Sequence, residues 1–156
     1  MVAQALHWHL CSVFGLPAAA SWHSHEPLPV VENEQAKTLW DFSIQTLTTV
    51  GSNRPDIVVF LKEGTTGILL LEISCPADMN ILMKEEEKIT KYQPLVQQMR
   101  QIYHQPVQVI PIVFGVTGMA SKNYLKKIPA YEDKLFASLQ MAVILGTTSI
   151  LRGLNI

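Results

Sequence analysis

Two carboxylates lie beside neighbouring apolar runs in this sequence. Asp56 directly precedes the run 57–61, and Glu72 lies inside the next run, 68–73. If the runs are adjacent strands, the two acids can meet at one end of a sheet, where a divalent cation relieves their mutual repulsion. Carboxylate oxygens suit Mg²⁺ or Mn²⁺ better than zinc, and the backbone carbonyl of Ile73 could supply another oxygen. The pattern predicts metal-assisted cleavage of a phosphodiester.

A nearby cation would complete this chemistry. Ser74 shares a strand face with Glu72, so the cation must come from another element. Lys84, Lys88 and Lys91 follow at steps of four and three, which places them on one stripe of a helix. A lysine on that stripe could hold the attacking water or stabilise the charge that grows on the phosphate.

The same residues also have ordinary structural interpretations. Asp56 alone is typical of a turn or a helix cap. The lysines lie beside the acidic run 85–87, and such a mixed run is typical of a solvated helix face. Glu72 is the stronger signal, because a carboxylate inside an apolar strand is costly to bury unless it is paired or bound to a metal.

Hydrophobic periodicity predicts the elements that position these residues. The runs 57–61 and 68–73 are expected to form a hairpin, and 107–114 a third buried strand. The other predicted elements are an amphipathic helix over 2–14, an ordered loop over 18–32, a helical turn over 33–39, a strand over 41–50, a helix over 80–103 that Pro94 kinks or splits, and helices over 120–127 and 134–154. This order predicts an α/β (α+β) fold, in which a small mixed sheet is flanked by helices.

The composition is that of one folded domain with a substantial core. The 156 residues are 48% hydrophobic and 16% charged, which argues against a disordered chain. The net charge is −1, whereas a protein that holds DNA by itself is usually basic. Other parts of a larger protein are therefore expected to do most of the DNA binding.

Three features of the sequence bear on where the protein acts: its two cysteines, the lack of a signal-peptide pattern and the lack of a long apolar run. Cys11 and Cys75 give no disulfide framework, so a reducing compartment is expected. Residues 1–14 lack the basic start and apolar core of a signal peptide. No apolar run approaches the roughly 18 residues that span a bilayer. The sequence predicts a protein that is neither secreted nor inserted in a membrane.

Many ordered matches to one domain family run along nearly the whole chain. The matching residues are His7, Trp8, Leu10, Cys11, Trp22, 25–27, 32–34, 39–41, 53–59, Pro76, Asp78, Asn80, 84–85, 87–88, 91–92, 111–113, Gly115, 121–123, 145–147 and 150–152. In this order they resemble the restriction-enzyme-like endonuclease domain at the C-terminal end of certain non-long-terminal-repeat retrotransposon polyproteins. That domain belongs to the PD-(D/E)xK nuclease superfamily, and its lysine has migrated to the following helix.

The resemblance implies roles for individual residues. Asp56 and Glu72 would be the metal ligands, with glutamate where aspartate is commoner. Lys88 and Lys91 would be the helix lysines, and the resemblance does not choose between them. Tyr92 would pack against or orient the site. Asp78 would be a motif residue of unclear role, and Leu47 and Leu61 depart from positions that are often acidic in relatives.

The resemblance also implies an organisation and partners. Residues 1–38 would be a helical and loop lead-in, and 39–156 a restriction-endonuclease-like domain within one globular unit. A reverse transcriptase and a zinc knuckle would lie upstream in an intact element, so the chain is expected to be a fragment or a solitary remnant. The domain would nick one strand of DNA to prime reverse transcription, in the nucleus or the cytoplasm. A catalytically weak remnant that binds nucleic acid or protein is the alternative, and an unrelated metal-dependent phosphoesterase is a third.

Several other residues could do chemistry but favour simpler explanations. His7, His9, Cys11, His23 and His25 are zinc-ligand types, but their spacing fits no common zinc finger, so loop packing and caps are the preferred interpretation. The remaining expectations are core positions for Trp8, Trp22 and Trp40, a buried thiol at Cys75, and a solvated face rather than a phosphate-binding patch for Lys122, Lys126, Lys127 and Arg152.

Overall fold

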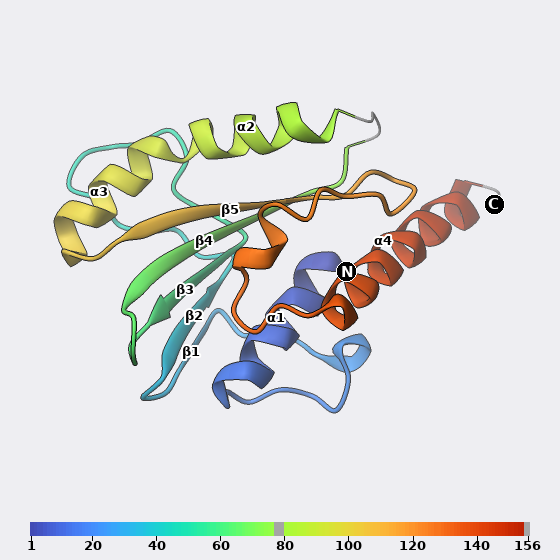
Figure 1. Cartoon of the computed structure of the whole chain (residues 1–156), viewed down its shortest axis with the longest axis horizontal. Helices are drawn as coiled ribbons and strands as arrows, with labels where there is room; N and C mark the ends of the chain where they lie inside the picture. The colour runs from blue at the N-terminus through green and yellow to red at the C-terminus, as the bar shows by residue number, and fades with distance from the viewer. Residues whose placement is uncertain (77–79, 155–156) are drawn as a thin grey trace.

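A five-stranded mixed sheet with helices on both faces forms the protein, as Figure 1 shows. The computed structural model describes residues 1–76 and 80–154, with side chains up to residue 146. The elements in chain order are α1 (Val2–Phe14), η1 (Trp22–Ser24), β1 (Val30–Glu32), β2 (Ala36–Trp40), β3 (Ile57–Leu61), β4 (Gly67–Ser74), α2 (Ile81–Lys91), α3 (Gln93–Tyr103), β5 (Val107–Val113), η2 (Leu125–Lys127) and α4 (Asp133–Leu154). The predicted α/β (α+β) fold class is confirmed.

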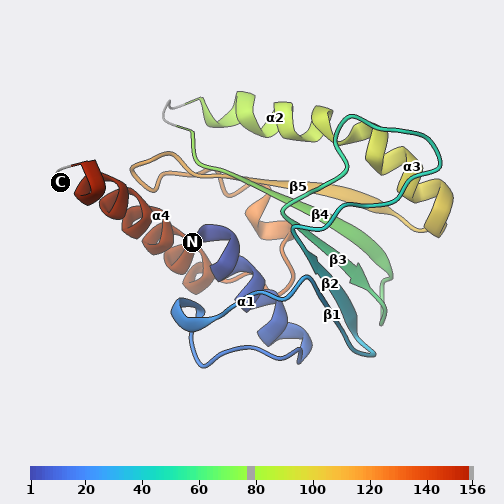
Figure 2. The same cartoon turned by 180° about the vertical axis from the view of Figure 1, so that it is seen from behind.

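The strands follow one another across the sheet in the order β1-β2-β3-β4-β5. The first four pair antiparallel, and β5 pairs parallel with β4. The parallel pair needs a long crossover, and α2 with α3 supplies it. Figures 1 and 2 show α2 and α3 over one face of the sheet, with α1 and α4 on the other side.

Alternation along the strands divides the core between the two faces of the sheet. Val58 and Leu70 pack with Leu95 and Met99 of α3. Ile57, Val59, Leu69 and Leu71 face the opposite way and pack with residues of α1 and α4, including Leu6, Leu10 and Leu139. Since side chains of a strand alternate faces, Glu72 points to the face that α2 and α3 cover, whereas Asp56 precedes β3 at the end of the sheet.

Local sequence explains how the crossover divides into two helices. The helix is interrupted at Tyr92, so that α2 ends at Lys91 and α3 begins at Gln93. Pro94 lies in the first turn of α3, where its missing N–H costs no intrahelical hydrogen bond. The prediction that Pro94 would split the helix over 80–103 is confirmed, as are the helix over 2–14 and the hairpin of β3 and β4.

The predictions for 33–39 and 41–50 are wrong. Residues Ala36–Trp40 form β2, because the Asn33 side chain fixes a tight turn after β1: its Oδ1 accepts hydrogen bonds from the backbone N–H groups of Gln35 (2.8 Å) and Ala36 (3.0 Å). Asp41 then adopts a φ of 48°, which ends the strand and starts a loop where 41–50 was expected to be extended.

Two further expectations are wrong, and one expected boundary falls inside a strand. The helix predicted over 120–127 is only the short 3₁₀ turn η2, since a loop folds back after β5 to pair Phe114 with Ala120. Cys75 is exposed rather than buried. The proposed division at residue 38 falls within β2, and α1 shares a core with α4. Among the described residues, no helix combines the length and hydrophobicity that crossing a membrane requires.

Candidate active site

Asp56 and Glu72 meet at the end of the β3–β4 hairpin that lies away from its turn. The register pairs Ile57 with Leu71, so one further step places Asp56 opposite Glu72. Glu72 Oε2 accepts a hydrogen bond from the Asp56 backbone N–H at 3.2 Å, and Asp56 Oδ2 accepts one from the Ile73 backbone N–H at 2.8 Å. The two carboxylates are therefore held against each other's strand.

Glu72 is almost fully buried, with 6% of its surface exposed, and other groups satisfy both of its carboxylate oxygens. The Tyr92 hydroxyl donates to Oε2 at 3.0 Å. On the other side, the ammonium groups of Lys88 and Lys91 lie 3.4 Å and 3.6 Å from Oε1. Burial of the charge is tolerable because it is both hydrogen-bonded and paired with cations.

The end of α2 brings these lysines and Tyr92 to Glu72. Lys88 and Lys91 are three residues apart and so share one helix face, and Tyr92 occupies the break before α3. The Lys88 side chain is 21% exposed and that of Lys91 is 43% exposed, and the Lys91 ammonium also lies over the Tyr92 ring. Lys84 instead pairs with Glu87 at 3.2 Å, away from the carboxylates.

The electrostatics of the site centre on Asp56. Burial raises the pKa of its carboxyl, and the negative charge of Glu72 adds to the increase. The hydrogen bond from Ile73 and the positive charge of Lys88 act against this and lower the same pKa. Burial and the Glu72 carboxylate also raise the pKa of Tyr92, so its hydroxyl stays protonated and remains a donor.

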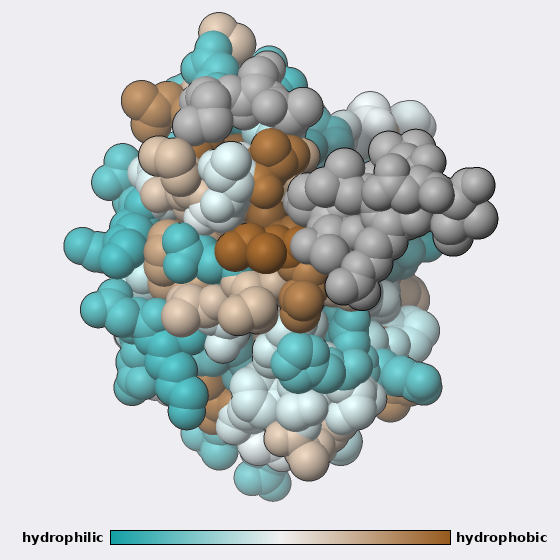
Figure 3. Space-filling view, turned by 90° about the vertical axis from the view of Figure 1, so that its right-hand side faces the viewer, coloured by the Kyte–Doolittle hydropathy of each residue, from teal (hydrophilic) through white to brown (hydrophobic). Residues whose placement is uncertain are grey.

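A cavity of about 380 Å³ opens beside Asp56. Asp56, Ile73 and Cys75 line one side of it, and the start of α1, Val116 and the middle of α4 line the rest. Figure 3 looks at this face from the right-hand side of Figure 1 and shows apolar side chains gathered near its centre. The cavity gives a ligand access to Asp56 at the end of β3.

Arg54 and Asp41 support the site, although no role was expected for them from their types alone. The Arg54 guanidinium pairs with the Asp41 carboxylate, with Nε and Oδ1 2.8 Å apart, and the Asp41 backbone N–H donates to the carbonyl of Asp56 at 3.0 Å. The Tyr92 hydroxyl also lies 3.4 Å from the Arg54 carbonyl. Their only signal in the sequence was their place in the matched segments 39–41 and 53–59.

The structure thus brings together Asp56, Glu72, Lys88 and Lys91, whereas other predicted positions lie elsewhere. Leu61 is at the turn end of the hairpin, opposite Gly67, and Leu47 is exposed in the loop before β3. Asp78 lies outside the described residues, as does the side chain of Arg152. The Ile73 carbonyl as a metal ligand stays a prediction.

Comparison with known proteins assigns the chain to no family. No protein-family model matches the chain, and no curated protein matches it either.

Proposed function

We propose that this chain is a metal-dependent DNA endonuclease domain that nicks one strand by hydrolysing a phosphodiester. The observation that carries the proposal is the meeting of the Asp56 and Glu72 carboxylates at one end of the hairpin, with the Lys88 ammonium 3.4 Å from Glu72. Two hard oxygen donors and a cation are the parts that such hydrolysis needs, and a cavity reaches one of the donors, Asp56.

The donor set suits Mg²⁺ or Mn²⁺. Among the described residues, Asp56 Oδ1 has no hydrogen-bond partner, and the Asp56 pKa is raised partly by Glu72, a repulsion that a divalent cation relieves. When bound, the ion would supply a water with a lowered pKa and neutralise charge on the phosphate. It must compete with Lys88 and Lys91, which already lie on Glu72 Oε1.

The protein's own residues then have distinct tasks. Asp56 and Glu72 would hold the ion, which would supply the attacking water. Lys88 is the less exposed lysine and its charge acts on Asp56, so we assign it the stabilisation of the phosphate oxygens, with Lys91 at the rim of the site. Tyr92 orients Glu72 through the hydrogen bond to Oε2.

The resemblance to retrotransposon endonuclease domains supplies the biological setting of the proposal. Target DNA, in the nucleus or the cytoplasm, is the substrate, and the nick primes reverse transcription by an upstream polymerase. The net charge of −1 fits a cutting module that depends on neighbouring domains, such as a zinc knuckle, to hold DNA.

A plasmid-nicking assay tests the proposal. Purified protein in excess over supercoiled plasmid, at low salt with Mg²⁺ or Mn²⁺, is expected to produce the nicked circle. Asp56→Asn and Glu72→Gln should abolish nicking, and Lys88→Met should reduce it by about 10²- to 10³-fold, the usual cost of one charge-stabilising donor. Lys84→Met is the matched control, because Lys84 is on the same helix but pairs with Glu87.

A catalytically weak remnant that binds nucleic acid or protein is the second candidate. Lys88 and Lys91 can neutralise Asp56 and Glu72 with no added ion, so the four charges sum to zero and the group is stable as a structural network. Folded protein that nicks at no concentration of either metal supports this candidate. So does nicking that survives Asp56→Asn, since a contaminating nuclease would then be the cause.

A further inference from the structure

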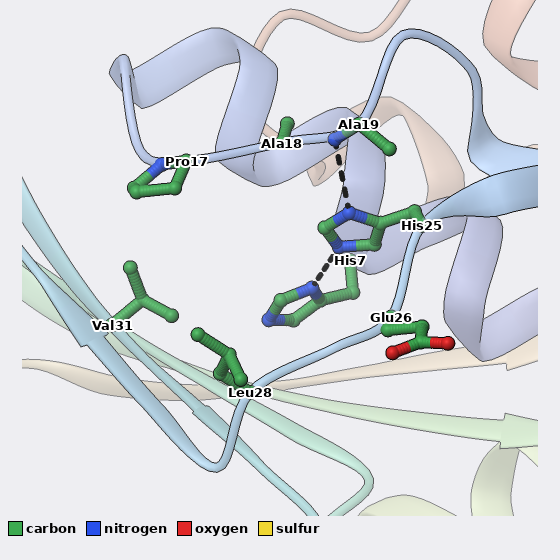
Figure 4. Close-up of a pocket in the computed structure, with 8 residues that line it drawn as sticks. All are labelled: His7, Pro17, Ala18, Ala19, His25, Glu26, Leu28 and Val31. Atoms are coloured by element: carbon green, nitrogen blue, oxygen red, sulfur yellow. Dashed lines mark hydrogen bonds between the residues drawn. The ribbon is translucent and has the colours of Figure 1, made fainter.

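A second group of metal-ligand side chains lies between α1 and the face of the sheet that α1 covers, opposite the face covered by α2 and α3. His7, Cys11 and His25 are buried, with 0%, 0% and 4% of their surfaces exposed. Their ligand atoms all lie within 4.8 Å of one another. His7 Nδ1 is 2.7 Å from His25 Nε2 and 3.6 Å from Cys11 Sγ. Figure 4 shows the two imidazoles facing each other from α1 and from the segment that follows η1.

Two different segments build this cluster. His7 and Cys11 are one helical turn apart on α1, so both point to the buried side of the helix. Gln4 fixes the segment that carries His25, because its Nε2 donates to the carbonyls of Trp22 and His25, each at 2.9 Å. His9 and His23 do not join the cluster: His9 contacts the carbonyl of Pro129 at 2.9 Å, and His23 is exposed and stacks on Trp22.

The chemistry of the three donors favours zinc over the hard cations of the first site. Imidazole nitrogen and thiolate sulfur are the ligands that zinc prefers. Burial, together with the neighbouring His25, lowers the pKa of His7 to about 4, so its ring is neutral and offers a lone pair. Burial raises the pKa of the Cys11 thiol to about 11, and the neighbouring Thr38 hydroxyl acts against this increase, so a bound metal would be needed to hold the thiolate. Thr38 Oγ1 is itself buried with no hydrogen-bond partner among the described residues. A thiolate held by a metal would accept the hydrogen bond that this hydroxyl lacks.

The spacing needs a small adjustment to admit the ion. In a tetrahedral zinc site, ligand atoms lie roughly 3.3–3.6 Å apart. The Cys11–His7 distance of 3.6 Å already fits, whereas the 2.7 Å between the two histidines must open by about 0.6 Å to reach this range. Ligation through His25 Nε2 puts the proton on Nδ1, and the contact given up there, from the Ala19 N–H, is long at 3.5 Å.

We propose that His7, Cys11 and His25 form a zinc site with a fourth position open to a water molecule. A pocket of about 330 Å³ lies beside both histidines and provides that opening. The site is structural, because it ties α1 to the segment between α1 and β1. The His7 ring also packs edge-on against Trp40 of β2, so the ion fixes the strand that leads to Asp41. Its donors and place differ from those of Asp56 and Glu72, and it does not depend on the nuclease proposal.

Cobalt spectroscopy on the whole chain tests the site, because a thiolate bound to Co²⁺ gives a charge-transfer band that histidine or carboxylate ligands do not. Wild-type protein titrated with Co²⁺ should show this band at one equivalent, and Zn²⁺ should remove it. Cys75→Ser leaves Cys11 as the sole thiol, so a band retained in this variant must come from Cys11. Metal analysis after dialysis should then find one zinc per chain.

Matched variants separate the cluster from its neighbours. Cys11→Ser should eliminate the band, and His25→Asn should weaken zinc binding by at least about 100-fold, because even loss of an outer partner of a ligand costs about 10- to 100-fold. His23→Asn, two residues away, should bind zinc as the wild type does. In the wild type, zinc should also raise the melting temperature above that in EDTA, a comparison that needs no variant to fold.

Three results would overturn the zinc site. They are folded wild-type protein with neither a thiolate band nor retained zinc, a band that disappears in Cys75→Ser, and equal losses in His23→Asn and His25→Asn. None of these readouts uses DNA cleavage, so a failed nicking assay would not count against the zinc site.

Discussion

Glu72 shows how one side chain can combine burial with charge. Its two oxygens face the Tyr92 hydroxyl, the Asp56 backbone N–H and two ammonium groups, so the carboxylate keeps partners on every side. Asp56 has fewer partners. Burial and the negative charge of Glu72 both raise its pKa, so its ionised form is the less stable of the two carboxylates. This difference makes Asp56 the residue whose ionisation limits stability and, in the proposed function, the binding of a cation.

Asp56→Asn is therefore expected to raise the melting temperature in EDTA at neutral pH while it abolishes nicking. The sign follows from linkage: a carboxyl whose pKa is raised on folding binds more protons in the native state, so wild-type stability falls as pH rises from the unfolded pKa through the folded one. Above that window the penalty is complete. Thermal unfolding across acidic to neutral pH measures it, and Glu63→Gln is the control, because Glu63 is an exposed acid in the turn between β3 and β4, at the far end of the hairpin. A variant that melts lower than wild type at neutral pH would contradict the assignment.

Tyr92→Phe should remove the hydroxyl that orients Glu72 with little change in packing. The hydroxyl donates to the charged Glu72 carboxylate, so losing this hydrogen bond should lower the free energy of unfolding by about 1.5–3 kcal/mol. Urea denaturation measures the cost, and the plasmid assay should show slower nicking in the same variant. Tyr103→Phe is the control, because Tyr103 is exposed at the end of α3. Equal effects of the two substitutions would show that the hydroxyl of Tyr92 has no special role.

At the scale of elements, the β1–β2 hairpin depends on Asn33 more than on strand propensity. The Asn33 Oδ1 accepts two backbone hydrogen bonds within the turn, and its Nδ2 donates to the carbonyl of Phe14, the last residue of α1, at 2.7 Å. One side chain thus closes the hairpin and attaches it to the first helix.

Asn33→Ala should lower the free energy of unfolding by about 2–3 kcal/mol, since it leaves two backbone donors in the turn and the Phe14 carbonyl without their partner. Asn33→Asp is the matched variant, because it keeps the acceptor for the turn and loses only the donor to Phe14. Chemical denaturation should therefore place Asn33→Asp between wild type and Asn33→Ala. An Asn33→Asp protein as unstable as Asn33→Ala would assign the whole effect to the Phe14 contact.

The elements that the sequence predicted correctly are those with strong local patterns. Strand 57–61 is a continuous apolar run, strand 107–113 is apolar except for Gln108, and α1 shows a clear apolar stripe. The failure at 33–50 has a specific cause: β2 is short, its side chains do not alternate cleanly, and it exists because it pairs with β3 over five positions. Such pairing is a tertiary interaction that a local pattern does not carry.

At the scale of the whole molecule, the low net charge limits how strongly the chain can attract DNA. The described basic residues after β5 form a small patch at best, because Lys122 already pairs with Asp133 at 3.6 Å and Lys127 lies over the Tyr124 ring. A net charge of −1 leaves little long-range attraction to phosphate.

The isolated chain is expected to bind duplex DNA weakly, with a slope of log affinity against log salt no steeper than about −3, since each phosphate contact contributes about −0.9. Fluorescence anisotropy over a range of salt concentrations measures the slope. The double variant Lys126→Glu and Lys127→Glu should make it shallower by about 2, and Lys37→Glu, on the distant strand β2, should change it little. A slope much steeper than −3 would show that the chain holds DNA without help from other domains.

The sequence by itself predicted the fold class, the strands β3, β4 and β5, and the two acids Asp56 and Glu72, because apolar runs and the charges beside them are local properties of the chain. Only the resemblance to a nuclease family selected Lys88 and Lys91 from the three helix lysines. The tertiary structure decided three things: that Lys88 and Lys91 share one oxygen of Glu72 while Lys84 does not, that Ala36–Trp40 is a strand, and that His25 reaches His7 and Cys11. Each depends on strand register, or on the path of a loop between residues far apart in the chain. Those are set by the burial of the whole core rather than by any short run of residues.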